Sequence, residues 1–485
     1  MRIKLFSVLL LHSFFLMAQQ PGQSVTIKGV DKAYAGYHLV MQKVINPVSM
    51  EMANLVTFQV DENGSFNQVI ELFDITYASL NMGKYRAYIY LEPGKTYELV
   101  LPPFKPRSDA DRFNPYFQPE DVVLGIANDE SQCLNQLIAH FDRDLSNRYN
   151  DNALAIFSRG NKRLAHEIIH ELDSLYPAEK ESYFQKYKQY AYGEILLLAN
   201  KRQKRNAIDQ TMQGEVAFKI PSFQKAFNVI YKNFFTNYFG SKPGEHLRDA
   251  YAKGATFDSL ALVLTKDTLY ASRQLAELVL LKGLFDAFYS GRYKEEQIIE
   301  LYHQAAESAS TPELKDIANR LHKKVTWLRT GTAAPQFTLY RLDGKERSLS
   351  DYEGKFVYLN FMHTSNHTCK KELQLLHVLS RQLKRELRIV TVIMDEDPAK
   401  AKALIKANKY RWDFLHYTAQ PKVILDYNIR ALPTYFVIDP TQKLRLSPSP
   451  SPSESFMPIF LEAQRKYRYE QLRKNKPKEK SIYDF

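Results

Sequence analysis

The first part of the chain is rich in strand-forming residues. Between residues 22 and about 105, short runs of β-branched and aromatic residues are separated by turn residues, most clearly at Asn63-Gly64 and Pro93-Gly94. This pattern predicts an antiparallel β-sandwich domain over residues 22–108. A charged, proline-rich connector follows at residues 102–121.

The periodicity changes after this connector. Apolar residues now recur at helical spacing in the segments 133–145, 163–177, 192–202, 223–235, 272–289 and 314–328. We therefore predict a helical domain of antiparallel helices over residues 122–328.

From Gly331 onward, strand-like and helix-like segments alternate with short links. A hairpin around Asp343-Gly344 leads to an expected order of strand 355–361, helix 370–386, strand 387–396, helix 398–409 and strand 434–440. This order predicts a mixed α/β domain over residues 331–470, so that the fold class is a multidomain α+β protein. The run SPSPSPSES at 447–455 predicts a flexible loop, and a last helix precedes a basic tail at 471–485.

The N-terminus has the pattern of a secretory signal peptide. In MRIKLFSVLLLHSFFLMA, Arg2 and Lys4 precede an apolar stretch, and Ala18 is a small residue suited to cleavage. We predict a signal peptide over residues 1–18 and export to the periplasm or cell envelope. No later stretch has the apolar length of a membrane helix, so we expect no membrane span.

The charge of the chain changes this picture little. The 485 residues carry a formal net charge of +12, and the basic residues are spread along the sequence without a nucleic-acid-binding motif. We expect a diffusely basic surface with some attraction to acidic partners, no nucleic-acid partner and no cofactor.

One stretch has the look of a redox site. FMHTSNHTCKKEL, residues 361–373, places Cys369 at the expected start of a helix that follows a strand. The phrase GTAAPQFTLYRLDGKERSLSDYEGKFVYLNF before it and YNIRALPTYFVID after it resemble the TlpA-like branch of the thioredoxin superfamily, which comprises AhpC/TSA-related thiol–disulfide oxidoreductases. The resemblance covers roughly residues 331–470 and implies a thioredoxin-like fold for the last domain.

The resemblance also implies roles for individual residues. In the family, a Cys-x-x-Cys pair opens the helix: the first thiolate attacks, favoured by the helix N-terminus, and the second, mostly buried cysteine resolves the mixed disulfide. Cys369 falls on the resolving position, Asn366 on the attacking position, Ser365 on a tryptophan, and Pro433 on a cis-proline that shapes the substrate groove. Asn366 is a good helix N-cap but supplies no thiol.

We therefore interpret the stretch as a degenerate active site in a non-catalytic binding or scaffolding protein. Its groove would hold an extended segment of a protein or peptide partner and would be formed by Asn366, His367, Thr368 and Pro433. Dithiol exchange would be lost because the motif holds only one thiol.

Three alternatives use the same stretch differently. Cys369 could act alone as a redox thiol. It could pair with Cys133, the chain's other cysteine. It could also bind copper or zinc together with His363 and His367, whose side chains suit these metals.

A second motif competes with the redox stretch. His166-Glu167-Ile168-Ile169-His170 spells the H-E-x-x-H of zinc metallopeptidases, in which two histidines share the metal and the glutamate activates water. Glu194 is the nearest candidate for a third ligand. The apolar residues of this segment predict that both histidines lie on the solvent face of the helix, which favours an ordinary surface helix.

Overall fold

The structure, a computed structural model, describes residues 22–474 apart from 109–110, 112–113, 115–116, 129–133, 178–181, 201–203, 213, 215 and 421. The predicted signal peptide, Cys133 and residues 475–485 of the predicted tail lie outside the described residues. The chain forms two compact units. The first holds residues 22–106, 119–293 and 308–317, and the second holds 107–118, 294–307 and the chain from 318 onward.

The first unit contains two sheets that share one core. The first sheet has the order β4-β1-β7-β9, with β1 (Gln23–Val30), β4 (Ser65–Leu72), β7 (Thr96–Val100) and β9 (Gly125–Ile126). The second has the order β3-β2-β5-β6-β8, with β2 (His38–Asn46), β3 (Glu51–Gln59), β5 (Thr76–Met82), β6 (Tyr85–Leu91) and β8 (Glu120–Val123). Apolar side chains from both sheets, such as Ile27 and Leu80, are fully buried in a common cluster.

Two features of these sheets differ from the predicted antiparallel sandwich. β1 pairs with β7 in parallel, and β6 pairs with β8 in parallel. A parallel pair requires a longer connection than a hairpin turn, and the chain between β6 and β8 includes both β7 and the proline-rich segment. β8 and β9 also carry the β-structure to Ile126, beyond the boundary predicted at residue 108.

Helices make up the rest of the first unit and lead into the second. They are α2 (Leu134–Arg159), α3 (Lys162–Leu175), α4 (Ser182–Ala191), α5 (Gly193–Ala199), α6 (Lys204–Met212), α7 (Pro221–Ile230), α8 (Phe234–Phe239), α9 (Glu245–Ala252), α10 (Phe257–Leu264), α11 (Arg273–Ser290), α12 (Glu295–Ser308) and α13 (Pro312–Thr326). Short 3₁₀ turns occur at Lys32–Tyr34, Lys242–Gly244 and Thr268–Tyr270. α11 is buried on nearly every face, which explains why its sequence is apolar all round.

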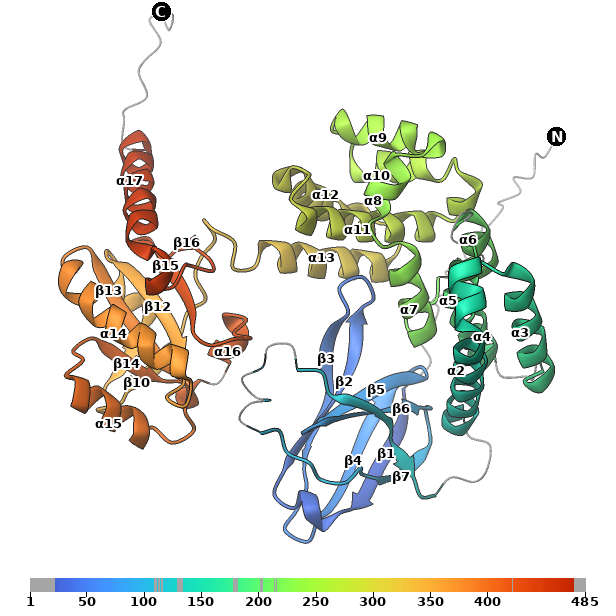
Figure 1. The fold of residues 1–485 in the computed structure, drawn as a ribbon, viewed down its shortest axis with the longest axis horizontal. Helices are drawn as coiled ribbons and strands as arrows, with labels where there is room; N and C mark the ends of the chain where they lie inside the picture. Colours follow the sequence, from blue (N-terminus) through green and yellow to red (C-terminus); the bar gives the residue numbers. More distant parts are fainter. Residues whose placement is uncertain are drawn as a thin grey trace, which may run out of the picture. The chain divides into compact units, whose positions relative to one another are not determined.

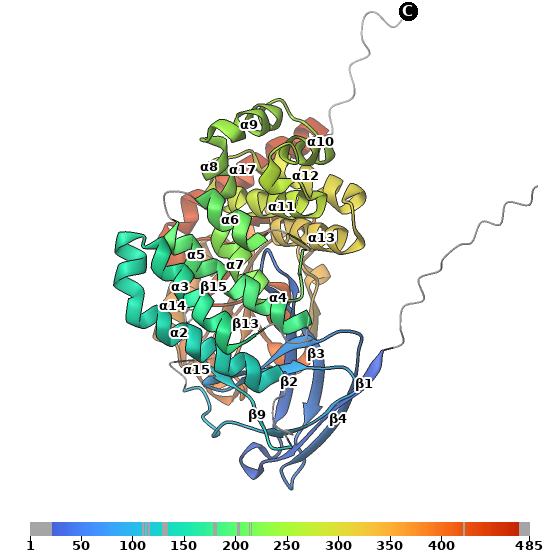
Figure 2. The same ribbon diagram turned by 90° about the vertical axis from the view of Figure 1, so that its right-hand side faces the viewer.

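The β-sheets and the helices of this unit are joined by buried hydrogen bonds. The Asn135 side chain of α2 accepts from the Tyr90 backbone N–H at 2.7 Å and donates to the Tyr90 carbonyl at 2.8 Å. At the tip of the long β2–β3 hairpin, the Asn46 amide donates to the Ile317 carbonyl of α13 at 3.2 Å (Figure 1 and Figure 2). Because the two parts form one compact unit, their division into separate domains stays a prediction.

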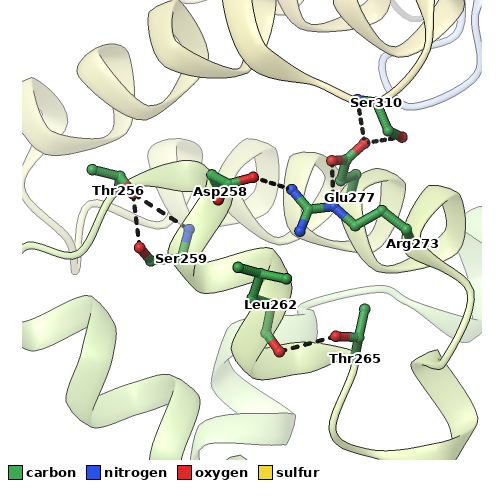
Figure 3. A network of polar contacts seen from close by, with 8 residues as sticks. All are labelled: Thr256, Asp258, Ser259, Leu262, Thr265, Arg273, Glu277 and Ser310. Carbon is green, nitrogen blue, oxygen red and sulfur yellow. Dashed lines mark hydrogen bonds and ion pairs between the residues drawn. The ribbon is translucent and has the colours of Figure 1, made fainter.

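A polar network fixes α11 inside the helical part. Glu277, with no exposed surface, accepts from the Arg273 guanidinium at 2.7 Å and from the Ser310 backbone N–H at 2.9 Å (Figure 3). Arg273 also donates to Asp258 of α10 at 2.6 Å. The network joins two helices to the turn before α13, which is a structural role.

The second unit contains a seven-stranded sheet of order β11-β10-β14-β13-β12-β15-β16. Its strands are β10 (Thr338–Arg341), β11 (Glu346–Ser348), β12 (Phe356–Met362), β13 (Leu387–Ile393), β14 (Asp413–His416), β15 (Thr434–Ile438) and β16 (Leu444–Leu446). Its helices are α14 (His367–Gln382), α15 (Ala399–Asn408), α16 (Val423–Asp426) and α17 (Phe456–Lys474), with 3₁₀ turns at Leu349–Tyr352, Tyr417–Ala419 and Pro452–Glu454.

The centre of this sheet carries the predicted α/β order. β12 is buried along its whole length, β13 and β14 run parallel to it in succession, and β15 runs antiparallel on its other side. Separate apolar clusters cover the two faces of the sheet. The predicted α/β domain is therefore present with its expected strands and helices.

Two predictions for the C-terminal end were wrong. The SPSPSPSES run is not a free loop, because the Tyr358 hydroxyl donates to the Pro450 carbonyl at 2.6 Å and the Ser453 backbone N–H donates to Glu372 at 3.2 Å. α17 also continues to Lys474, four residues into the predicted tail. Among the described residues, no helix has the combination of length and apolar character needed to cross a membrane.

Candidate functional site

The start of α14 is organised by the side chain of Asn366. This residue has an extended conformation just before the helix, and its Oδ1 accepts from the Cys369 backbone N–H at 3.1 Å. Its Nδ2 donates to the Leu432 carbonyl at 3.1 Å. Because a helix N-terminus leaves backbone N–H groups without partners, an asparagine at this position stabilises the first turn.

The Leu432 contact brings a second segment to the site. The Leu432–Pro433 peptide bond is cis, and β15 begins directly after it at Thr434, which pairs with Phe361 of β12. The predicted groove residues Asn366 and Pro433 are thus brought together across the ends of these two strands. His367 and Thr368, the other two predicted groove residues, are exposed in the first turn of α14.

Cys369 points into the core. It is 1% exposed and belongs to the apolar cluster that also contains Leu373 and Tyr435. Burial raises the pKa of the Cys369 thiol to about 11, partly opposed by a backbone hydrogen bond at His363, while the nearby Asp395 charge adds to the rise. Since the thiolate is the nucleophile, this cysteine is poorly placed for redox chemistry at neutral pH.

A buried carboxylate in the acidic run 395–397 supports the loop before α14. Asp395 is 4% exposed, follows β13, and accepts from the Thr364 backbone N–H at 2.9 Å and from the Thr364 hydroxyl. His363 Nδ1 lies 3.7 Å from the same carboxylate and accepts from the Ser365 backbone N–H at 3.1 Å. An acidic residue after a strand commonly caps the next helix, and in this structure that role belongs to Asp397.

The groove side of the site opens into a cavity of about 440 Å³. Its walls come from three loops, represented by His363 and Ser365, by Asp395 to Asp397, and by Arg430 to Leu432. Lys400 of α15 contributes a further charge. The cavity therefore offers charged and apolar surface directly beside the cis-proline segment.

A second buried carboxylate lies one turn after Cys369. Glu372 is 5% exposed and accepts from the Ser453 backbone N–H at 3.2 Å and from the Ser453 hydroxyl. The serine–proline run thus covers this part of α14. Sequence reading missed both partners, because a single glutamate in a helix and a low-complexity run carry no signal for such a contact.

The metal sites that were considered as alternatives do not assemble. Within the described residues, no three His, Cys, Asp or Glu side chains gather in a cluster suited to a metal ion. His166 and His170 are exposed on α3, while Glu167 pairs with Arg163 at 2.7 Å and Glu194 pairs with Lys225 at 2.8 Å. The zinc-peptidase alternative therefore has no third ligand from Glu194.

The copper or zinc alternative at the redox stretch fails for a similar reason. Cys369 is buried, His367 is exposed, and His363 Nδ1 accepts from the Ser365 backbone N–H. A pairing of Cys369 with Cys133 lies outside the described residues.

These features define a thioredoxin-type domain: central parallel strands, a helix starting at the end of β12, and a cis-proline facing that start.

Comparison with known protein families and curated proteins supports the same class of domain. Residues 330–447 match the AhpC/TSA family. Among curated proteins, the chain is 29% identical over 118 residues to the thioredoxin-like protein YneN of Bacillus subtilis, which is 24% of this chain and 69% of that protein. It is 32% identical over 119 residues to the thiol-disulfide oxidoreductase ResA of Bacillus anthracis, covering 24% and 68% of the two chains.

Two solved structures are also similar to part of the chain. The thioredoxin domain of a thiol-disulfide oxidoreductase from Bacteroides vulgatus is 23% identical, covers 28% of this chain and 98% of its own, and has a TM-score of 0.26. A putative thiol:disulfide interchange protein DsbE from Chlorobium tepidum is 22% identical and has a TM-score of 0.25. The match covers 29% of this chain and 96% of that structure.

The chain belongs to the thioredoxin superfamily as a TlpA-like protein related to thiol-disulfide oxidoreductases. The residues that match the AhpC/TSA family lie within the second unit.

Proposed function

We propose that this chain is an exported TlpA-like protein whose thioredoxin-type domain has lost dithiol exchange and serves as a binding or scaffolding module of the cell envelope. The support for export is the apolar, basic-led segment at residues 1–18. The support for lost chemistry is that the family's attacking cysteine aligns, by motif, with Asn366.

The observation that carries this proposal is the pairing of Asn366 with a buried Cys369. Both ends of the Asn366 amide are engaged, one with the helix start and the other with Leu432. The sulfur that would have resolved a mixed disulfide is enclosed by apolar side chains and holds its proton at neutral pH. A lone-thiol redox reaction at Cys369 would need that sulfur to reach solvent.

The groove retains what binding requires. The cis Leu432–Pro433 segment contacts Asn366, which directly precedes the exposed His367 and Thr368, and Leu432 also lines the charged cavity. We propose that an extended segment of a protein or peptide lies along this groove and leaves without covalent reaction.

A gain-of-function variant tests the loss of chemistry. Asn366→Cys places a thiol at the helix start, where the dipole lowers its pKa. The introduced thiolate attacks a substrate disulfide and releases one substrate thiolate. Cys369 then attacks the mixed disulfide and releases the other, and dithiothreitol reduces the resulting internal disulfide.

Insulin reduction by dithiothreitol reports this cycle as turbidity. We expect wild type, Cys369→Ser and Asn366→Ser to match the rate without protein, and Asn366→Cys to exceed it. If wild type accelerates the reaction and Cys369→Ser does not, the domain is an active thiol enzyme and the proposal is wrong.

Photo-crosslinking tests the groove. A photoreactive residue replaces Thr368, and a matched control replaces the exposed Arg465 of α17. The probe is carboxymethylated lactalbumin, which stays unfolded and has no free thiol. We expect adducts from position 368 and not from position 465, and equal labelling of both positions would contradict a groove-specific interaction.

A further inference from the structure

The second unit contains another cavity, which lies away from the Cys369 site. Its volume is about 420 Å³, and it is lined by the turn between β10 and β11, by α15 and by the start of β14. β14 begins at Asp413, beside this cavity, and ends at His416. The Nε2 atom of His416 contacts the carbonyl of Asp395, a residue that lines the first cavity, at 2.7 Å. The two cavities have no lining residue in common and lie at opposite ends of β14, a strand labelled in Figure 1. We call the second one the basic pocket.

The basic pocket carries an excess of positive charge. Its lining includes the cationic side chains Arg341, Lys402, Lys406, Lys409 and Arg411, against the single carboxylate of Asp343. Arg341 is neutralised by Asp413 at 2.8 Å and by Asp343 at 3.3 Å. In the part of the chain that the structure describes, the other four cations form no ion pair, so their charge is available to a ligand.

The floor of the basic pocket is aromatic. The Trp412 ring lies 4.9 Å from both the Tyr410 and the Phe414 rings, centroid to centroid. Its indole N–H donates to Thr391 Oγ1 at 2.9 Å, which fixes the ring, and Trp412 keeps part of its surface exposed. Ile405 of α15 adds an aliphatic side chain to the same lining. The pocket thus combines a rigid apolar floor with a cationic rim.

The geometry points to the basic pocket as a binding site for an acidic segment of a partner protein that carries a hydrophobic or aromatic side chain. Lys402 and Lys406 are one helical turn apart, a rise of about 6 Å, and Lys409 and Arg411 extend the charge beyond the end of α15. One small anion would meet only one or two of these cations. An extended peptide advances about 3.3 Å per residue and so presents carboxylates along the whole rim.

The apolar floor completes this complementarity. An aromatic side chain between the acidic residues can stack on Trp412 while the carboxylates meet the lysines. This site goes beyond the proposed groove function, because it uses other residues at the far end of β14 and does not depend on Cys369 or Asn366.

Fluorescence anisotropy tests the inference with the full chain. The probe is a fluorescein-labelled peptide in which one Phe is flanked on each side by Asp-Glu-Asp. Its control peptide replaces every Asp and Glu by Asn and Gln. The test variant is Lys402→Glu/Lys406→Glu, and Arg465→Glu/Arg468→Glu on α17 is a matched control with the same change in net charge.

We expect the acidic peptide to bind wild type and the α17 control alike, and the α15 variant to lose affinity by roughly tenfold or more. A peptide with Ser in place of Phe should bind more weakly, and the amide peptide should not bind. A milder variant, Lys402→Gln/Lys406→Gln, guards against misfolding and should show an intermediate loss.

Three results would overturn the inference. The first is an affinity unchanged by the α15 charge reversal. The second is an equal loss in both charge-reversal variants, which would show attraction to the net charge alone. The third is selective binding of the α15 lysines to phosphatidylserine-containing vesicles without binding of the peptide, which would make this face a membrane-contact surface.

Discussion

The side-chain oxygen of Asn366 accepts a hydrogen bond from the backbone N–H of Cys369 at 3.1 Å. This contact sets the first turn of α14, at the position that the proposed function assigns to the family's attacking cysteine. The neutral amide caps the helix without supplying a thiol. The same side chain also donates to the Leu432 carbonyl.

The first prediction concerns the structural value of Asn366. Asn366→Ala removes the helix cap and the bond to Leu432, and we expect a loss of about 1–2 kcal/mol in unfolding free energy. Asn366→Ser keeps a cap oxygen and, like the alanine variant, lacks the bond to Leu432, so it should lose less than the alanine variant. Urea unfolding followed by Trp fluorescence measures both. Equal losses would show that the cap oxygen contributes nothing.

The second prediction concerns the buried Asp395. Asp395→Asn replaces one acceptor oxygen by an NH₂ group that faces the Thr364 donors, and we expect a cost of about 1–3 kcal/mol. Because the His363 to Ser365 loop forms a wall of the first cavity, crosslinking from position 368 should weaken as well. An unchanged stability would show that Asp395 does not hold this loop.

The third prediction is a pH dependence at Asp142 of α2. This carboxyl accepts from the Tyr187 hydroxyl at 2.8 Å and 2.9 Å, and burial raises its pKa from 3.8 to about 6 despite that bond. Because the folded-state pKa of Asp142 is raised, its protonated carboxyl contributes fully to folding stability below pH 3.8. This contribution is lost as pH rises through about 6.

A comparison of melting temperatures between pH 4 and 7 measures this effect. We expect wild type to lose stability relative to Asp142→Asn across this interval, by on the order of 1–3 kcal/mol. Parallel melting curves for the two proteins would contradict a raised pKa at this site.

The fourth prediction concerns the Glu277 network of Figure 3. Glu277→Gln keeps the shape but leaves the Arg273 guanidinium without its buried counter-charge and weakens the Ser310 bonds. We expect a destabilisation of about 2–4 kcal/mol. Asp258→Asn, which removes only the exposed partner of Arg273, should cost well under about 1 kcal/mol. The reverse order would mean that the buried carboxylate is not the centre of the network.

The sequence predicted the strands and helices of the α/β part of the second unit well because their signals are local. Strand and helix periods alternate from Gly331 onward, and the family phrases place Cys369 and Pro433 on recognisable positions. The structure brings Asn366 and the cis Leu432–Pro433 bond together as that resemblance implied.

The remaining features depend on contacts between distant segments. β8 has only four residues, two of them acidic, and its pairing is with the distant strand β6. Asp395 and Glu372 gain their meaning from Thr364 and Ser453, which lie 31 and 81 residues away in the chain. No periodicity within a short window reports such partners.

The most direct test of the account is the alkylation rate of Cys369 in the native protein. A Cys133→Ser background leaves Cys369 as the sole thiol, and iodoacetamide labelling is compared at pH 6 and 8, with Cys369→Ser as the blank. Since the pKa of Cys369 is about 11 and the sulfur is buried, we predict labelling only after unfolding in urea. Fast labelling of the folded protein at pH 6 would mean an exposed thiolate and would contradict a domain that has kept its shape and lost its chemistry.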